Sequence, residues 1–297
     1  MGDRAILLTG GAGQVGTEFQ RLAPQGFEIV APSRDRLDLT NPDSVAAAVA
    51  SRPWAAVINS AAYTAVDKAQ SDPVTAWQVN ALAPAAFAWA TAQAGIPLIQ
   101  LSTDYVFDGA KTSPYVEDDP VGPVSVYGAS KEAGEQAVRT GNPRHVILRT
   151  AWVVSPHGGN FIKTMLRLAE TRDRLTVVDD QHGCPTSAAD IAAALGVIAG
   201  RMISDAEAPS GTYHFVNSGE ATWCGFAREI FALAQARGRA VPTVEAIPTS
   251  AYPTPARRPA NSRLDTAKLK RDFGVEPRDW RTATSEVVET LLAGQTD

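Results

Sequence analysis

Residues 5–16 read AILLTGGAGQVG, a short apolar run that leads at once into a cluster of glycines. A tight turn from a strand into a helix needs glycines, because backbone N–H groups must approach a pyrophosphate that the positive end of the helix stabilises. The loop fits GxGxxG through Gly11, Gly13 and Gly16, and GxxGxxG through Gly10, Gly13 and Gly16. Its place between an apolar run and a helix-compatible segment predicts a dinucleotide-binding turn rather than a flexible loop.

Short β-rich runs alternate with helix-compatible segments through the first half of the chain. We expect strands at residues 5–9, 27–31, 55–59, 98–102 and 146–150. Near-continuous apolar strands separated by helices predict an α/β fold with a Rossmann-type, doubly wound parallel sheet. Asp72 and Pro73 are typical of a helix N-terminus, and Pro84 should kink or interrupt that helix.

Beyond Thr150 the alternation of strands and helices loosens, which predicts a smaller, discontinuous C-terminal substrate lobe. We expect helices at residues 160–170, 187–198 and 280–292, strands at 175–179 and 213–216, and a strand with an ordered loop in the Pro-rich stretch 241–259. The dinucleotide-binding domain is expected to comprise residues 1–150 plus about 176–217. The substrate lobe then comprises about 151–175 and 218–297.

The composition is that of a globular protein, with 44% hydrophobic and 20% charged residues among 297. The formal net charge of −5 argues against a nucleic-acid partner, which needs clustered Lys and Arg. Only two cysteines occur, Cys184 and Cys224, which are too few for a disulfide framework and fit a reducing cytoplasm. The start has no signal-peptide pattern and no stretch approaches about eighteen apolar residues, so no membrane partner is expected. The sequence leaves open a monomer or a homodimer.

The residues after the second strand bear on cofactor choice. An NAD-selective site has an acidic side chain there for the ribose 2'-hydroxyl, whereas this chain has Ser33 and Arg34. A hydroxyl and a guanidinium suit a 2'-phosphate, so NADPH is favoured and NADH stays an alternative. Asp38 is a candidate for the adenine amine, and a turn or cap role for it is nearly as well supported.

Tyr127 and Lys131 stand four residues apart, which on a helix places both side chains on one face. An ammonium beside a phenol favours the phenolate, so we expect a lowered pKa for Tyr127 and a role as general acid or base. Thr103 follows the strand at 98–102, and ligands of open parallel sheets sit beyond the carboxyl ends of strands. Thr103 is therefore expected to hydrogen-bond the reacting oxygen, although a strand-end hydroxyl can also satisfy local backbone groups.

Four segments together resemble the extended short-chain dehydrogenase/reductases: the glycine loop, NSAAYTAVD at 59–67, STDYVFDG at 102–109 and YGASK at 127–131. Within that superfamily the chain is similar to the dTDP-4-dehydrorhamnose reductase family. The similarity continues at residues 149–153, 159–161, 180–186 and 258–264, so it spans almost the whole chain. It implies NADPH-dependent reduction of the 4-keto group of dTDP-4-dehydro-L-rhamnose to dTDP-L-rhamnose, in nucleotide-sugar biosynthesis.

By this resemblance Thr103, Tyr127 and Lys131 form the catalytic trio. The cofactor would be lined by Gly13, Gln14, Val15, Ser33, Asp38, Leu39, Ala61, Ala62 and Tyr63, and the sugar nucleotide would contact Thr103, Asp104 and Trp152. The chain departs from the pattern twice. Ser33 and Arg34 replace the acidic side chain of some relatives, and Cys184, interpreted as a packed thiol, stands where a small apolar residue is expected.

A diphosphate bound to an acidic protein needs cations nearby. Arg258 and Arg263 both lie in the expected lobe, and Arg258 is the better candidate. Four scattered histidines without carboxylates at ligand spacing argue against a catalytic metal. A structural Mg²⁺ stays open, although no site for it is identified.

Two other functions stay open beside the reductase. One is a nucleotide-sugar epimerase or dehydratase on the same scaffold, although a dehydratase needs an Asp-Glu pair after Thr103 and this chain has Asp104 and Tyr105. The other is a non-catalytic regulatory subunit resembling the methionine adenosyltransferase β subunit.

Overall fold

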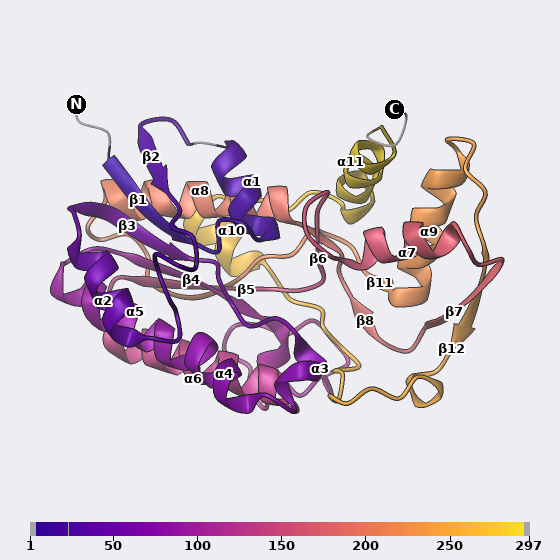
Figure 1. The fold of residues 1–297 in the computed structure, drawn as a ribbon, viewed down its shortest axis with the longest axis horizontal. Helices are drawn as coiled ribbons and strands as arrows, with labels where there is room; N and C mark the ends of the chain where they lie inside the picture. Colours follow the sequence, from indigo (N-terminus) through magenta and orange to yellow (C-terminus); the bar gives the residue numbers. More distant parts are fainter. Residues whose placement is uncertain (1–3, 23, 294–297) are drawn as a thin grey trace.

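The computed structural model describes residues 4–22 and 24–293, and its central feature is a parallel sheet (Figure 1). The sheet has six strands in the order β10-β5-β4-β3-β1-β2. They are β1 (Arg4–Thr9), β2 (Phe27–Val30), β3 (Trp54–Asn59), β4 (Leu98–Thr103), β5 (His145–Thr150) and β10 (Gly211–His214). The five strands expected in the first half are all present, and the predicted α/β class is confirmed.

Helices cover both faces of this sheet, which explains why its inner strands are largely apolar (Figure 1). On one face α1 (Gln14–Leu22), α8 (Ala188–Ser204) and α10 (Ala267–Phe273) pack against Ile6 and Leu8. On the other face α2 (Pro42–Ala50), α5 (Ala83–Gln93) and α6 (Val126–Gly141) cover Leu7. Successive residues of β1 thus point to opposite faces, as the period of a strand requires, and the sheet is doubly wound.

The helix expected after Asp72 is interrupted, as Pro84 predicts. The short helix α3 (Val66–Ala69) comes first, and α4 (Pro73–Trp77) then begins with Asp72 at its N-cap. A π-helical segment, η1 (Gln78–Leu82), separates α4 from α5, and Pro84 lies in the first turn of α5. Proline in a helix interior clashes with the carbonyl four residues earlier, and a widened turn relieves this clash. The widened turn carries Asn80, which is 1% exposed.

The smaller lobe packs beyond the carboxyl ends of β4 and β5 (Figure 1). It contains α7 (Phe161–Ala169), β7 (Arg174–Val178), α9 (Trp223–Gln235), β12 (Thr243–Ile247) and α11 (Trp280–Ala293). The other short elements of the chain outside the main sheet are η2 (Asp104–Val106), which follows β4, and β6 (Val153–Val154), β8 (His182–Gly183), β9 (Thr186–Ser187), β11 (Ala221–Thr222) and η3 (Thr249–Ala251). Phe226, Ile230 and Trp280 are fully buried in the core of this lobe. The helices expected at 160–170, 187–198 and 280–292 are present.

Two elements bear on the expected domain boundaries. The strand β7 runs to Val178 and pairs in parallel with β12 inside the smaller lobe. The helix α10 returns from that lobe to the main sheet, where Leu269 is buried against the core of the larger domain. We therefore propose the division stated above with two changes, residues 176–178 assigned to the smaller lobe and α10 to the larger domain. Within the described residues no helix is long and apolar enough to cross a membrane.

Two helical glycines test the packing. A Cβ on Gly134 of α6 would lie 2.1 Å from the carbonyl oxygen of Asn80, whereas a Cβ on Gly200 of α8 would meet nothing within 4 Å. We expect Gly134→Ala to lower the free energy of unfolding by about 1–3 kcal/mol, because backbone must move. Gly200→Ala should raise it by about 0.5–1 kcal/mol through helix propensity. Urea unfolding of both variants measures this, and equal effects would contradict the packing described.

Candidate active site

Three segments meet at one edge of the sheet because of its strand order. The chain leaves β1 for β2 on one side, whereas β3, β4 and β5 follow on the other side, so the order reverses beside β1. Ligands of open α/β sheets bind at such a reversal, beyond the carboxyl ends of the strands. The glycine loop follows β1, residues 60–63 follow β3, and Thr103 ends β4.

The glycine loop is closed so tightly that side chains are excluded at two positions. Gly10 has a φ of 72°, and a Cβ there would lie 2.9 Å from the backbone nitrogen of Ala61. A Cβ on Gly16 would lie 2.1 Å from the carbonyl oxygen of Gly10. The helix α1 begins at Gln14, directly after the turn, and the first N–H groups of a helix lack intrahelical partners. This bare backbone fits a pyrophosphate group.

Asn80 holds the neighbouring segment 61–63 in place. Its Oδ1 accepts a hydrogen bond from the backbone N of Tyr63 at 2.8 Å, and its Nδ2 donates to the Tyr63 carbonyl at 3.1 Å. The same Nδ2 donates to Oγ of Ser130 on α6 at 3.0 Å. One buried amide therefore links the segment after β3 to the helix that carries Tyr127. Sequence reasoning missed Asn80, although a polar residue inside the apolar run 79–88 was a signal for it.

The turn after β2 exposes the residues expected to choose the cofactor. Ser33 and Arg34 are both exposed. Oδ1 of Asp38 accepts hydrogen bonds from N and Oγ1 of Thr40 at 2.8 and 2.7 Å, and these bonds lower the pKa of the Asp38 carboxyl. The Asp38 carboxylate thus stabilises the turn in which it lies, and its contact with adenine stays a prediction.

Thr103, Tyr127 and Lys131 come together as predicted. All three are buried, with exposed fractions of 6%, 8% and 4%. The Ser125 hydroxyl caps α6 by accepting from the Gly128 nitrogen at 3.1 Å, which fixes the start of the helix at Val126. A hydrogen bond links Tyr127 to Thr103, and Nζ of Lys131 donates to the Leu101 carbonyl of β4 at 2.7 Å.

The expected lowering of the Tyr127 pKa is wrong for this structure. Burial raises the pKa of Tyr127 to about 12, and the hydrogen bond with Thr103 opposes that rise only in part. The Lys131 ammonium donates to the Leu101 carbonyl, and burial lowers its own pKa to about 8. The spacing of the two residues correctly predicts their shared face, whereas the direction of the pKa shift depends on burial that the spacing does not reveal.

Asp104 lies beside this group and is 3% exposed. Its Oδ1 accepts from the Thr103 hydroxyl at 3.0 Å, whereas its buried Oδ2 has no hydrogen-bond partner. Burial raises the pKa of Asp104 to about 6, and the hydrogen bond from Thr103 opposes the rise only in part. An ionisable oxygen buried without a partner is costly to the fold, which marks it as a group available to a ligand.

Trp152 follows β5 in a strained backbone conformation. Its φ of 49° is the only left-handed value of a non-glycine residue in the described part of the chain. Its indole stacks on Trp223 of α9 with ring centroids 3.5 Å apart. Strain of this kind costs free energy and persists where surrounding contacts enforce it. The stack joins the end of β5 to the smaller lobe, and the contact of Trp152 with a sugar stays a prediction.

Arg258 bridges the two parts of the molecule. Its Nη2 donates to Oδ2 of Asp67 at 2.7 Å, and Oδ1 of Asp67 accepts from the backbone N of Ala256 at 3.1 Å. Its Nη1 is buried and has no hydrogen-bond partner. The guanidinium is thus held by α3 of the larger domain with donor capacity to spare. Asp67 was not among the predicted site residues.

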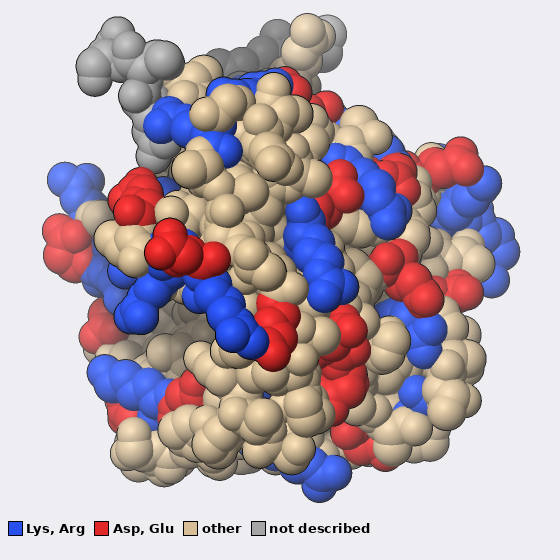
Figure 2. Space-filling view, turned by 90° about the vertical axis from the view of Figure 1, so that its right-hand side faces the viewer, with Lys and Arg blue, Asp and Glu red and all other residues tan. Residues whose placement is uncertain are grey.

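Charged side chains of both signs mingle over the end of the molecule formed by the smaller lobe (Figure 2). That face is hollowed at one side, and Lys or Arg side chains reach over the rim of the hollow (Figure 2). In residues 4–22 and 24–293 no group of three or more His, Cys, Asp or Glu could hold a metal ion. Cys184 is 1% exposed, and its Sγ donates to the Asn217 carbonyl, so it is a packed thiol as interpreted.

A doubly wound sheet with a tyrosine and a lysine one turn apart behind its fourth strand is the architecture of the extended short-chain dehydrogenase/reductases. The chain belongs, within that class, to the RmlD substrate binding domain family, whose model matches residues 4–293.

Individual relatives are similar over their full length. The dTDP-4-dehydrorhamnose reductase of Sinorhizobium fredii is 48% identical over 97% of both chains. That of Escherichia coli K12 is 43% identical over 97% of this chain and 98% of its own.

Solved structures agree with this assignment. A dTDP-4-dehydrorhamnose reductase from Clostridium acetobutylicum superposes with a TM-score of 0.90 at 38% identity, and one from Bacillus anthracis in complex with NADP with 0.88 at 33%. Each match covers 97% of this chain and 99% of the other.

The stability of an Asp104 variant tests whether the buried carboxylate stabilises or destabilises the fold. Because its pKa is raised from 3.8 to about 6, the ionised form destabilises the fold, and this cost develops as the pH rises through that window. Asp104→Asn should therefore raise the thermal unfolding midpoint at neutral pH, and the gain should shrink at about pH 5. A variant less stable than the parent at neutral pH would show that the carboxylate serves the fold.

Proposed function

We propose that the chain is an NAD(P)H-dependent oxidoreductase that reduces the 4-keto group of dTDP-4-dehydro-L-rhamnose to dTDP-L-rhamnose, in nucleotide-sugar biosynthesis. The observation that carries the proposal is the buried group of Thr103, Tyr127 and Lys131 at the same end of the sheet as the closed glycine loop. The full-length similarity to dTDP-4-dehydrorhamnose reductases supports the choice of substrate. The choice of cofactor is supported by a relative, the Bacillus anthracis reductase, whose structure was solved in complex with NADP.

The residues at the sheet edge fit a dinucleotide. The glycine loop (Gly10, Gly13, Gln14, Val15, Gly16) would hold the pyrophosphate, and the adenosine half would lie against Ser33, Arg34, Asp38 and Leu39. The nicotinamide half would lie against Ala61, Ala62, Tyr63, Tyr127 and Lys131. When bound, the reduced nicotinamide supplies the hydride that the ketone carbon accepts.

The chain supplies the proton that balances this reduction. With a pKa of about 12, Tyr127 carries its phenolic proton at neutral pH, which is the form that a general acid needs. Tyr127 donates that proton to the ketone oxygen, which becomes the 4-hydroxyl group of the product. Thr103 orients the same oxygen, and the charge of Lys131 stabilises the phenolate left behind.

Substrate contacts are assigned to Thr103, Asp104, Trp152 and Arg258. The unpartnered Nη1 of Arg258 provides a buried cationic donor, which suits an oxygen of a diphosphate. The unpartnered Oδ2 of Asp104 provides an acceptor for a sugar hydroxyl. Trp152 would contact the deoxysugar. We further propose a cytoplasmic location and a monomer or homodimer.

The function is tested by oxidation of NADPH with dTDP-4-dehydrorhamnose generated in situ. Substrate-dependent oxidation that is faster than with other 4-keto nucleotide sugars supports the reductase. Tightly bound NAD retained through purification would instead favour an epimerase. Stoichiometric binding of a protein partner without NADPH oxidation would favour a regulatory subunit. A dehydratase lacks support, because Tyr105 after Asp104 packs edge-on against Tyr127 with ring centroids 5.4 Å apart.

Removing the phenolic hydroxyl tests the acid. Tyr127→Phe should lower kcat by about a hundredfold or more while the Kd for NADPH stays close to that of the parent, because the hydroxyl acts on the ketone oxygen. Turnover assays and fluorescence titration with NADPH measure the two effects. The exposed Tyr252 gives a matched control, Tyr252→Phe, with unchanged turnover. Full activity of Tyr127→Phe would remove Tyr127 from the mechanism.

Arg34 tests the preference for NADPH. Arg34→Ala should raise the KM for NADPH about tenfold, because one charge-assisted hydrogen bond to the 2'-phosphate is lost. The KM for NADH should stay nearly unchanged, because NADH has no 2'-phosphate. Arg36→Ala, at the other exposed arginine of the same turn, is the control. Equal changes for both cofactors would show that Arg34 does not read the 2'-phosphate.

A further inference from the structure

The short helix α3 contacts the start of the helix that carries the expected proton donor. Ala69 of α3 is fully buried in a cluster with Tyr127, and Val66 packs against the same cluster. Oε1 of Gln70, the residue that follows α3, accepts a hydrogen bond from the backbone N of Val126 at 2.8 Å. The helix α3 is therefore fixed against the first turn of α6, directly beside the phenol.

Asp67 connects the same short helix to the segment that carries Arg258. Its Oδ2 accepts from Nη2 of Arg258 at 2.7 Å, and its Oδ1 accepts from the backbone N of Ala256 at 3.1 Å. Ala256 is itself fully buried. Both oxygens of one carboxylate are thus used on three consecutive residues of the smaller lobe. Asp67 holds the backbone before Arg258 and also the guanidinium.

The backbone after Arg258 is fixed as well. The backbone N of Asn261 donates to the Gly109 carbonyl at 3.1 Å. A Cβ on Gly109 would lie 2.4 Å from Cβ of Pro259, so the two segments are in direct contact. Because the main chain is held on both sides of Arg258, the direction of its guanidinium depends on the contact with Asp67.

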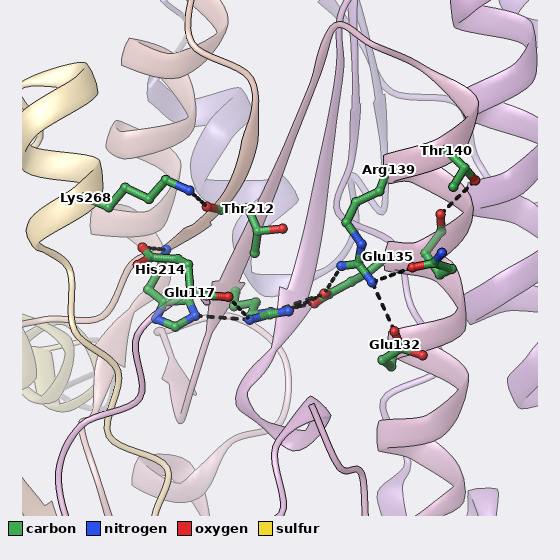
Figure 3. Close-up of polar contacts among 10 residues, drawn as sticks. Glu117, Glu132, Glu135, Arg139, Thr140, Thr212, His214 and Lys268 are labelled. Atoms are coloured by element: carbon green, nitrogen blue, oxygen red, sulfur yellow. Dashed lines mark hydrogen bonds and ion pairs between the residues drawn. The ribbon is translucent and has the colours of Figure 1, made fainter. Parts of the chain in front are cut away.

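A second arginine–carboxylate pair in the larger domain has no donor to spare. Nε and Nη2 of Arg149 donate to the Glu135 carboxylate at 2.9 and 2.7 Å, and its Nη1 lies 3.4 Å from Nε2 of His214. Figure 3 shows Glu135 on one side of this contact and His214 on the other. Arg258 differs because its buried Nη1 has no hydrogen-bond partner. A buried donor of this kind is available to a ligand.

The ion pair between Asp67 and Arg258 is not deeply buried. The two side chains are 41% and 20% exposed, and ion pairs with this much exposure contribute little to stability. Direction matters more, because a guanidinium binds phosphate oxygens through donors in a fixed planar arrangement. The pair is therefore better suited to orienting a donor than to stabilising the fold.

We propose that Asp67 is a positioning residue for Arg258, directing its unpartnered Nη1 to the diphosphate and fixing, through α3, the spacing between that diphosphate and Tyr127. The proposal rests on the reductase function proposed above. In a sugar nucleotide the diphosphate and the ketone are separated by a fixed length of covalent structure. A diphosphate held at the correct distance brings the ketone oxygen to the phenol, which is how positioning residues increase the rate of a reaction.

The test is the Kd for dTDP, measured by isothermal titration calorimetry. Asp67→Asn should raise this Kd about tenfold, because the guanidinium loses the charge-assisted hydrogen bond that orients it. Asn keeps an oxygen for the backbone N–H of Ala256, which spares the main chain. In turnover assays the KM for the sugar nucleotide should rise by a similar factor, kcat should change less, and the Kd for NADPH should equal that of the parent.

Two variants of neighbouring residues separate this role from general damage to α3. Lys68→Gln changes an exposed charge next to Asp67 and should leave the Kd for dTDP unchanged. Gln70→Ala removes the contact with Val126 and should lower kcat, with the Kd for dTDP again unchanged. A loss of dTDP binding in Gln70→Ala as large as that in Asp67→Asn would contradict the proposal.

A double-mutant cycle tests whether Asp67 acts through Arg258. Arg258→Ala alone should weaken dTDP binding, and the addition of Asp67→Asn should weaken it no further. Additive losses overturn the proposal, as does a folded Asp67→Asn variant that binds dTDP as tightly as the parent or more tightly. If the expected cycle is found but the parent oxidises no NADPH with the sugar nucleotide, the proposed reduction is wrong and the positioning role stands.

Discussion

The close approach of α6 to the carboxyl end of β4 is the constraint on which the site depends. A Cβ on Gly128 would lie 2.2 Å from the carbonyl oxygen of Tyr105, so the helix can lie this close to η2 only with glycine there. That approach buries Tyr127 and Lys131, brings Nζ of Lys131 to the Leu101 carbonyl and sets both pKa shifts. The chemistry of the pair is therefore a consequence of packing.

Contacts between the two parts of the molecule converge on the same edge. Gln14 of the glycine loop accepts hydrogen bonds from Ser155 and Asn160, which lead into α7 of the smaller lobe, at 3.1 and 3.0 Å. Asp67 and Arg258 make the corresponding link on the other side. The surface expected for the cofactor and the surface expected for the sugar nucleotide are thus joined by polar contacts between the two parts of the molecule.

Local patterns predicted much of the fold and part of the site. Apolar strands, the helix start at Asp72 and Pro73, and the spacing of Tyr127 and Lys131 are encoded within a few residues, and the structure confirms them. The clamp by Asn80, the return of α10 to the sheet and the left-handed backbone of Trp152 depend on residues far apart in the chain. The pKa of Tyr127 was predicted in the wrong direction for the same reason, because burial is a property of the assembled fold.

The central claim is that this edge of the sheet places a reduced nicotinamide against the ketone carbon of a nucleotide sugar, with Tyr127 supplying the proton. Its most direct measurement is the mass of the product formed with NADPH deuterated at the transferable C4 position, in ordinary water. The account predicts one deuterium on C4 of the sugar, because the hydrogen added at that carbon comes from NADPH and not from the solvent. An unlabelled C4, or label that exchanges with water during turnover, would contradict it.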